Sequence, residues 1–142
     1  MTTPAGRKPI EFHPIGAIES PLTDMQAAPR QGDEGAPHAW LVLDPSLSEG
    51  LDGLEPGDRI IVLTFLDRAD RRVLHTHPRN DPERAQRGVF ATRSPDRPNP
   101  IGLHDVTALV IDGDRILVDQ LDALDSTPIL DIKPVLPRVA DR

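Results

Sequence analysis

Apolar residues occur along the chain in short runs separated by turn-forming residues. The most apolar run is residues 59–66, Arg-Ile-Ile-Val-Leu-Thr-Phe-Leu, which follows the turn signal Glu-Pro-Gly-Asp at 55–58. β-Branched residues favour strands, whereas Pro-Gly pairs favour turns. We therefore predict a central strand over residues 59–66.

The same pattern predicts further short strands. Their expected ranges are 11–20 with a bend at Pro14, 39–43, 72–77, 88–92, 106–111, 115–121 and 129–132. Between two of them, Asp112-Gly113 is a hairpin turn pair. Many short strands joined by turns indicate an all-β fold, a small closed or nearly closed β-barrel.

Helices are expected only as short connections. Asp44 is suited to cap a helix that begins at Pro45, and Gly50 or Gly53 should end it. The 16 prolines leave little room for longer helices. A length of 142 residues suits a single domain over 1–142, without a C-terminal domain.

One proline-rich segment carries several polar groups. Residues 88–102 read Gly-Val-Phe-Ala-Thr-Arg-Ser-Pro-Asp-Arg-Pro-Asn-Pro-Ile-Gly. Each proline fixes its own φ and restricts the residue before it, so we expect a stiff, extended loop. A stiff loop suits a binding site, and it would present Arg93, Ser94, Arg97 and Asn99. The alternative is a proline-stiffened connection between strands.

The formal net charge of −7 argues against a nucleic-acid partner. However, residues 68–97 contain eight of the 16 basic residues, all arginines, against Asp70, Asp81, Glu83 and Asp96. This segment forms either a basic patch on an acidic body or a solvated arginine-rich loop. A sheet that stacks RNA bases is not expected, because the aromatic residues are only Phe12, Trp40, Phe65 and Phe90.

Disulfide, metal and membrane sites find little support. The chain has no cysteine, which excludes disulfides and thiolate zinc sites. His75 and His77 would share one face of a strand, but only Asp81 lies near enough in sequence to be a third ligand. We therefore expect a polar strand end and no metal. No apolar run has the length of a membrane span and no signal peptide is evident, so we expect a cytoplasmic protein without a membrane partner.

Two other motifs have limited specificity. Ser94, His104 and Asp105 are the residue types of a hydrolase triad, but no nucleophile elbow is present, and neighbours on a strand point to opposite faces. Asp125-Ser-Thr-Pro is typical of an Asx turn, which either caps the structure or offers polar groups to a ligand. Rossmann and P-loop glycine patterns are absent.

Four segments together carry a resemblance. They are Pro-Ile-Gly-Ala-Ile-Glu-Ser-Pro at 14–21, Pro-Arg-Gln at 29–31, Gly-Val-Phe-Ala-Thr-Arg-Ser-Pro-Asp-Arg-Pro-Asn-Pro-Ile-Gly-Leu at 88–103, and Leu-Asp-Ser-Thr-Pro-Ile-Leu-Asp-Ile-Lys-Pro at 124–134. In order and spacing they resemble the TsaA-like, or TrmO-type, tRNA methyltransferase family over about residues 10–138.

The resemblance implies a small non-Rossmann β-barrel that binds S-adenosyl-L-methionine. It also implies a homodimer that methylates N6 of threonylcarbamoyl-modified adenosine beside the anticodon of tRNA. The residues it implies for the cofactor are Pro29, Arg30, Gln31, Asp67, Arg93, Leu103, Asp125, Ser126, Thr127 and Pro128. Asp125 is also the candidate to orient the adenine amine, and the residues expected to meet substrate RNA are Arg79, Arg87, Arg97 and Asn99.

Some positions depart from the family pattern. Ser126 stands where the family usually has the glycine of Asp-Gly-Thr-Pro, and His104 where it has the serine of Gly-Leu-Ser. Leu66 and Asp67 align with a polar pair that is often His-Gln. Two alternatives therefore stay open: a related barrel that methylates another substrate, and a non-catalytic module that binds the cofactor.

Overall fold

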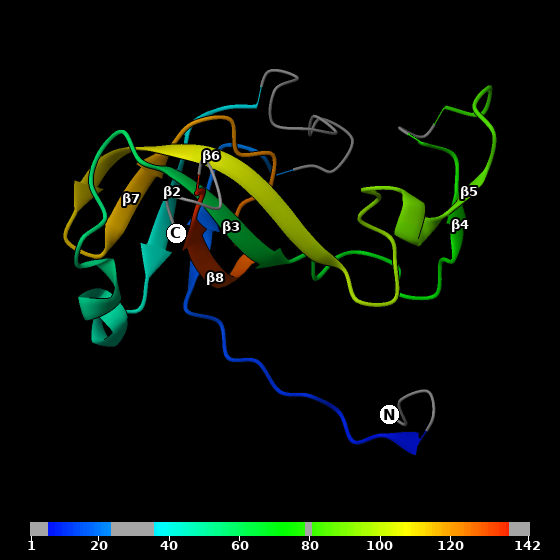
Figure 1. Ribbon diagram of the computed structural model, residues 1–142, viewed down its shortest axis with the longest axis horizontal. Helices are drawn as coiled ribbons and strands as arrows, with labels where there is room; N and C mark the ends of the chain where they lie inside the picture. Colours follow the sequence, from blue (N-terminus) through cyan, green and yellow to red (C-terminus); the bar gives the residue numbers. More distant parts are fainter. Residues whose placement is uncertain (1–5, 24–35, 79–80, 137–142) are drawn as a thin grey trace.

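The structure is a computed structural model that describes residues 6–23, 36–78 and 81–136. Six antiparallel strands pair in the cyclic order β1-β2-β7-β6-β3-β8, and β8 pairs with β1 to close the ring (Figure 1). The strands are β1 (Gly16–Glu19), β2 (Ala39–Leu43), β3 (Arg59–Phe65), β6 (Ile101–Asp112), β7 (Arg115–Val118) and β8 (Pro128–Pro134). The predicted all-β barrel is confirmed.

Alternating side chains fill the interior of the barrel. In β3, for example, Ile60, Val62 and Thr64 are buried while their neighbours are more exposed, as the period of two in a strand requires. The core consists of Ile18, Ala39, Leu41, Leu43, Ile60, Val62, Val106, Ala108, Ile116, Val118, Leu121, Ala123 and Ile129. Small and medium aliphatic side chains suit a barrel this narrow.

The connections follow the turn and capping signals. A 3-10 helix, η3 (Pro45–Leu51), begins with proline at its first position, and the Asp44 carboxylate accepts a hydrogen bond from the Ser46 N–H at 2.9 Å. Asp52 caps its end, directly before Gly53 with φ +94°. The β6–β7 hairpin turns at Gly113, where φ is +62°. Across the described residues, no helix is long and apolar enough to cross a membrane.

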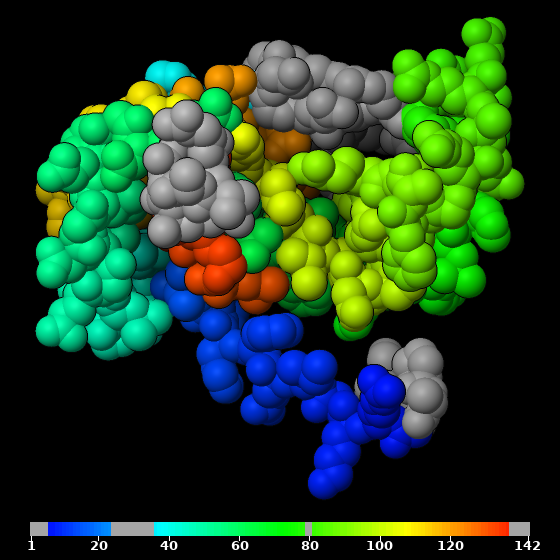
Figure 2. Space-filling view, in the orientation of Figure 1, coloured from blue at the N-terminus to red at the C-terminus, as the bar shows by residue number. Residues whose placement is uncertain are grey.

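Between β3 and β6 the chain leaves the barrel over residues 67–99. Figures 1 and 2 show this segment, in green to yellow-green, beside the barrel. It contains a two-stranded ladder of β4 (His75–Thr76) and β5 (Arg87–Gly88), followed by a 3-10 helix, η5 (Val89–Ala91). The predicted strand over 72–77 is therefore reduced to two residues. The predicted strand over 88–92 is wrong, because beyond Gly88 the chain turns and buries Val89 instead of continuing a ladder.

Strand β6 is longer than predicted, starting at Ile101 and not at 106. Its first half pairs with β3 alone, and pairing with β7 begins only at Ala108. Over residues 101–107 the other edge of β6 therefore pairs with no strand of the described chain. Instead, Thr107 exchanges hydrogen bonds with Asp119, through its N–H to the Asp119 carboxylate at 2.8 Å and its carbonyl to the Asp119 N–H at 3.2 Å. This open edge positions the candidate site.

Candidate functional site: a cleft along the open edge of β6

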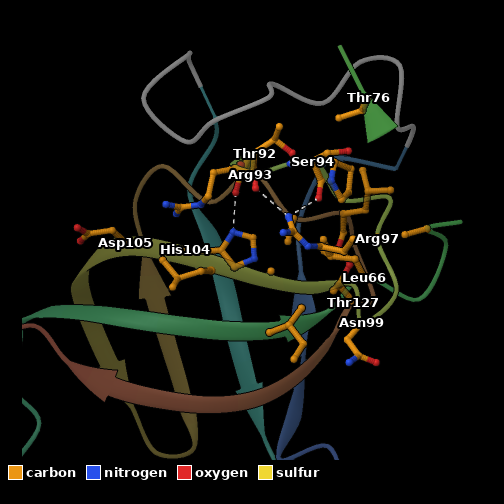
Figure 3. A pocket seen from close by; sticks show the side chains of 18 of the residues that line it. Leu66, Thr76, Thr92, Arg93, Ser94, Arg97, Asn99, His104, Asp105 and Thr127 are labelled. Carbon is orange, nitrogen blue, oxygen red and sulfur yellow. Dashed lines mark hydrogen bonds and ion pairs between the residues drawn. The ribbon is translucent and has the colours of Figure 1, made fainter. Parts of the chain in front are cut away.

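A cleft of about 1130 Å³ runs along the first half of β6. One wall is the 66–69 turn and the proline-rich loop at 90–99, and the opposite wall is formed by residues 119–127. Figure 3 shows side chains from these segments, among them Arg93, His104 and Thr127, around this cleft. The volume slightly exceeds the range of ordinary small-molecule sites, about 300 to 1,000 Å³.

Backbone polar groups face the cleft from the open edge. At the start of the β3–β6 ladder, the Leu66 N–H donates to the Pro100 carbonyl at 2.8 Å. From there, every second residue of β6 turns its backbone polar groups toward β3. The intervening residues, Leu103 and Asp105, therefore turn their N–H and C=O groups toward the open edge. Such a donor and acceptor pair, without a hydrogen-bond partner among residues 6–23, 36–78 and 81–136, can recognise the edge of a planar heterocycle.

A buried polar chain forms part of the cleft wall. His104 is only 8% exposed, and its Nδ1 lies 2.6 Å from Oδ1 of Asp122. Its Nε2 lies 2.8 Å from the Thr64 hydroxyl, which is fully buried. Gly102 makes room for this arrangement, because a Cβ there would lie 2.7 Å from His104 Nε2 and would also overlap the Thr64 hydroxyl.

Most of the arginines at the cleft already have partners. Arg59 pairs with Asp105, and the pKa of Arg59 is raised by that hydrogen bond first and by the charge of Asp105 second. The Nε atom of Arg84 lies 3.8 Å from Oδ2 of Asp81. Within the described part of the chain, Arg87 and Arg93 have no hydrogen bond or ion pair. These two exposed cations are therefore available to an anionic ligand.

Hydrogen bonds, as well as prolines, hold the loop. Arg97 donates to three backbone carbonyls of the same loop, those of Val89, Thr92 and Ser94, at 2.8 to 3.0 Å. From the 67–72 turn, Arg71 reaches the carbonyl of Pro98 and the side chain of Asn99. The expected stiff loop is thus fixed against its neighbouring turn.

The residues expected to form the site fall into three groups. Those that line the cleft are Asp67, Arg87, Arg93, Arg97, Asn99, Leu103 and Thr127. Asp125, Ser126 and Pro128 do not line it. Pro29, Arg30, Gln31 and Arg79 lie outside the described residues.

Asp125 serves the fold in this structure. Its Oδ1 accepts a hydrogen bond from the Ser20 N–H at 2.9 Å, and its own N–H donates to the Leu22 carbonyl at 2.7 Å. The Asp125 side chain thus ties the 125–128 turn to the end of β1. The predicted Asx turn is not formed, because the Thr127 N–H donates to the Leu124 carbonyl and not to the Asp125 carboxylate. Ser126, at the tip, has φ +69°, a left-handed conformation that explains why glycine is usual there.

From the sequence, His104 was a possible triad member and a departure from the family pattern. In the structure it is joined to Asp122 and Thr64, whereas Asp105, the next residue of β6, pairs with Arg59. The sequence signal for the burial of His104 is the alternation of side chains along β6, in which the even-numbered residues His104 and Val106 point inward. Asp122 gave no such signal, because its position depends on how residues 119–124 return along β6.

The two histidines considered as metal ligands have a different arrangement. His77 Nδ1 donates to the carbonyl of Arg84 at 2.8 Å, and His75 is exposed. No group of three or more His, Asp or Glu side chains suited to a metal occurs among residues 6–23, 36–78 and 81–136.

Comparisons with known proteins agree with this architecture. A sequence model described as tRNA-methyltransferase O N-terminal domain matches residues 17–141. An S-adenosyl-L-methionine-binding protein of Archaeoglobus fulgidus is 41% identical over 126 residues, which cover 89% of each chain. A longer protein of the same organism, described as a probable S-adenosyl-L-methionine-binding protein, is 42% identical over 88% of this chain and 34% of its own length.

Solved structures show the same fold. A crystal structure of TrmO from Pseudomonas aeruginosa matches 92% of this chain with a TM-score of 0.71 and 34% identity. This chain spans 57% of the length of that protein and about a third of the longer archaeal relative. The match over residues 17–141, together with the shared barrel, shows that the chain belongs to the family of the tRNA-methyltransferase O N-terminal domain.

Proposed function

We propose that the protein is an S-adenosyl-L-methionine-dependent methyltransferase that acts on N6 of threonylcarbamoyl-modified adenosine in tRNA. The observation that carries the proposal is the cleft on the open edge of β6, where Arg87 and Arg93 are unpaired within the described chain. The names of the archaeal relatives support the cofactor, and the family supports the reaction.

The groups in the cleft suit this cofactor chemically. Arg93 can pair with the carboxylate of its amino-acid portion, and Asp67 can accept hydrogen bonds from ribose hydroxyls or the ammonium. The open-edge backbone of Leu103 offers a donor and an acceptor to the adenine edge, while the side chains of Leu66 and Leu124 supply apolar surface. The cleft volume allows a cofactor and an acceptor base together.

The residues of this chain contribute position more than reactivity. When bound, S-adenosyl-L-methionine supplies an electrophilic methyl group. An in-line displacement then needs the acceptor nitrogen held close to that carbon, and two fixed walls achieve this. The loop held by Arg97 and the 119–127 segment form these walls in the structure.

The RNA side of the proposal rests on charge. Arg87 is exposed at the cleft, and Asn99 lies on the same loop as Arg93. These residues, together with Arg79, can meet phosphates, whereas Arg97 is engaged with its own loop and contributes mainly by fixing it. The homodimer implied by the resemblance and the cytoplasmic location are part of the same proposal.

The test is incubation of purified protein with labelled cofactor and total tRNA, followed by nucleoside analysis. We expect N6-methylated threonylcarbamoyladenosine, and RNA binding that weakens with salt because phosphate contacts release counterions. A digest without the methylated nucleoside, from tRNA shown to contain threonylcarbamoyladenosine, would overturn the proposed reaction.

A second candidate is a non-catalytic module that binds the cofactor. It is favoured by the names of the relatives, which state binding and no reaction. Calorimetric binding of S-adenosyl-L-methionine without methyl transfer to any cellular RNA fraction would select this candidate over the first.

A further inference from the structure

We propose that Asp122 is the catalytic carboxylate of this cleft, and that His104 and Thr64 are positioning residues that orient it. This inference rests on the proposed methyl transfer and names the group that accepts the proton of the attacking N6, which is the N–H of a urea linkage in the modified adenosine. None of these three residues belongs to the set that the family resemblance implied.

Asp122 is placed to act on a ligand. Its side chain is 20% exposed and lines the cleft, while its Oδ1 is held 2.6 Å from His104 Nδ1. Within the described chain, Oδ2 has no hydrogen bond or ion pair. One carboxylate oxygen is therefore fixed by the protein, and the other is left for a donor in the cleft.

The hydrogen bonds that link Thr64, His104 and Asp122 determine which nitrogen of His104 carries the proton. An ionised carboxylate only accepts hydrogen bonds, so His104 must carry a proton on Nδ1. In a neutral ring Nε2 is then an acceptor, and the Thr64 hydroxyl 2.8 Å away supplies its donor. The Asp122 carboxylate thus fixes the tautomer of His104, the Thr64 hydroxyl holds the other side of the ring, and His104 in turn holds Asp122.

The proposed reaction needs such an acceptor. A bond forms between the N6 nitrogen and the methyl carbon, and the bond from that carbon to sulfur breaks and leaves its electron pair on sulfur. The N6 proton passes to Asp122 Oδ2 and then to water. General-base assistance of this kind contributes about 100-fold or more to a rate.

Asp125 is less suited to this role. It does not line the cleft, and its Oδ1 accepts the backbone N–H of Ser20. Asp105 also lines the cleft, but its side chain is paired with Arg59. Asp67 and Asp119, the other carboxylates at the cleft, are the remaining alternatives, but Asp119 is bonded to the Thr107 N–H and Asp67 is exposed on the 66–69 turn.

The first test is Asp122→Asn, which preserves the shape and removes the charge. We expect the single-turnover rate of methyl transfer, at saturating cofactor and tRNA, to fall about 100-fold. Calorimetric affinity for S-adenosyl-L-methionine should change by less than about threefold. Asp112→Asn, an exposed carboxylate at the far end of β6, is the matched control and should keep the wild-type rate.

The second test separates positioning from packing. His104→Asn retains an N–H donor near the Nδ1 position, whereas His104→Gln retains one near Nε2 and loses the bond to Asp122. We expect His104→Asn to keep a rate within about tenfold of wild type and His104→Gln to approach the rate of Asp122→Asn. Nitrogen NMR of the wild-type protein should show His104 protonated at Nδ1.

The outcomes are distinct. If the wild type methylates tRNA and Asp122→Asn does so equally fast, the inference is overturned while the proposed function stands. A neutral His104 protonated only at Nε2, or a lost cofactor affinity in a folded Asp122→Asn protein, also overturns it. An inactive wild type overturns the proposed function. It also overturns the role of Asp122, because no N6 proton then has to be accepted.

Discussion

The Arg97 guanidinium donates to the backbone carbonyl of Val89, with Nη2 and the oxygen 2.8 Å apart. Its Nη1 donates to two further carbonyls of the same loop, at 2.9 and 3.0 Å. One side chain thereby binds three backbone acceptors of the loop, and the Val89 carbonyl among them also accepts from the Thr92 N–H and hydroxyl. The planar guanidinium, with donors in a fixed fork, is suited to this.

Replacing Arg97 should loosen the loop without unfolding the barrel. Arg97→Ala removes all three bonds, and we expect the local stability of residues 89–99 to fall by about 2 kcal/mol. Amide hydrogen exchange should accelerate in this segment and stay unchanged in β2 and β7. Arg97→Lys should behave like Arg97→Ala, because an ammonium lacks the fork; wild-type exchange in either variant would contradict this.

Arg93 should contribute directly to cofactor affinity. Arg93→Ala removes a cation that is unpaired in the described chain, and loss of a charge-assisted bond of about 1.5 to 3 kcal/mol corresponds to roughly 10- to 100-fold weaker binding. Calorimetry with S-adenosyl-L-methionine measures this. Arg72→Ala is the control, because Arg72 pairs with Asp70 away from the cleft; equal affinities for the two variants would remove Arg93 from the site.

Ser126→Gly should stabilise the protein. Ser126 has φ +69°, which glycine adopts without steric strain, so we expect a gain of about 1 kcal/mol in the free energy of unfolding. Among the residues that the structure describes, its hydroxyl makes one exposed bond, to Asp125 at 3.3 Å. Thermal unfolding provides the measurement.

Ser126→Ala is the comparison for that experiment, since it keeps the strained conformation and loses only the hydroxyl. It should not stabilise. If the alanine variant gains as much stability as the glycine variant, the explanation by backbone strain is wrong.

Gly102→Ala should be strongly disruptive. A Cβ at Gly102 would overlap the buried Thr64 hydroxyl and lie 2.7 Å from His104 Nε2, so we expect a loss of about 2 to 3 kcal/mol in denaturant unfolding. Gly50→Ala has open space around it and should be tolerated. A Gly102→Ala protein as stable as Gly50→Ala would show that the Thr64–His104 contact is not tight.

The barrel could be predicted because its signals are local. The run at 59–66, the Asp112-Gly113 turn and the Asp44-Pro45 cap each specify a structure within a few residues, and each is found. The segment at 88–92 misled because the chain turns there, so that Val89 is buried whereas Phe90 is 83% exposed. In so short a run, the spacing of apolar residues cannot distinguish a strand from a turn.

The site was predictable in part, for a similar reason. The proline loop revealed Arg93, and the resemblance added Leu103 and Thr127, all of which line the cleft. The bond between His104 and Asp122 was not predictable, since it joins residues 18 apart through the path of an irregular segment. The engagement of Asp125 with Ser20, 105 residues away, is equally a product of the tertiary structure.

The excursion at 67–99 begins and ends at neighbouring points, because the Leu66 N–H donates to the Pro100 carbonyl at 2.8 Å. A segment whose two ends meet this closely can change in length and composition without displacing the strands that flank it. Local opening of this segment, such as loss of the Arg97 bonds would cause, can therefore leave β3 and β6 paired. The candidate site thus joins a barrel edge that is held by its ladder to a loop whose mobility can change separately.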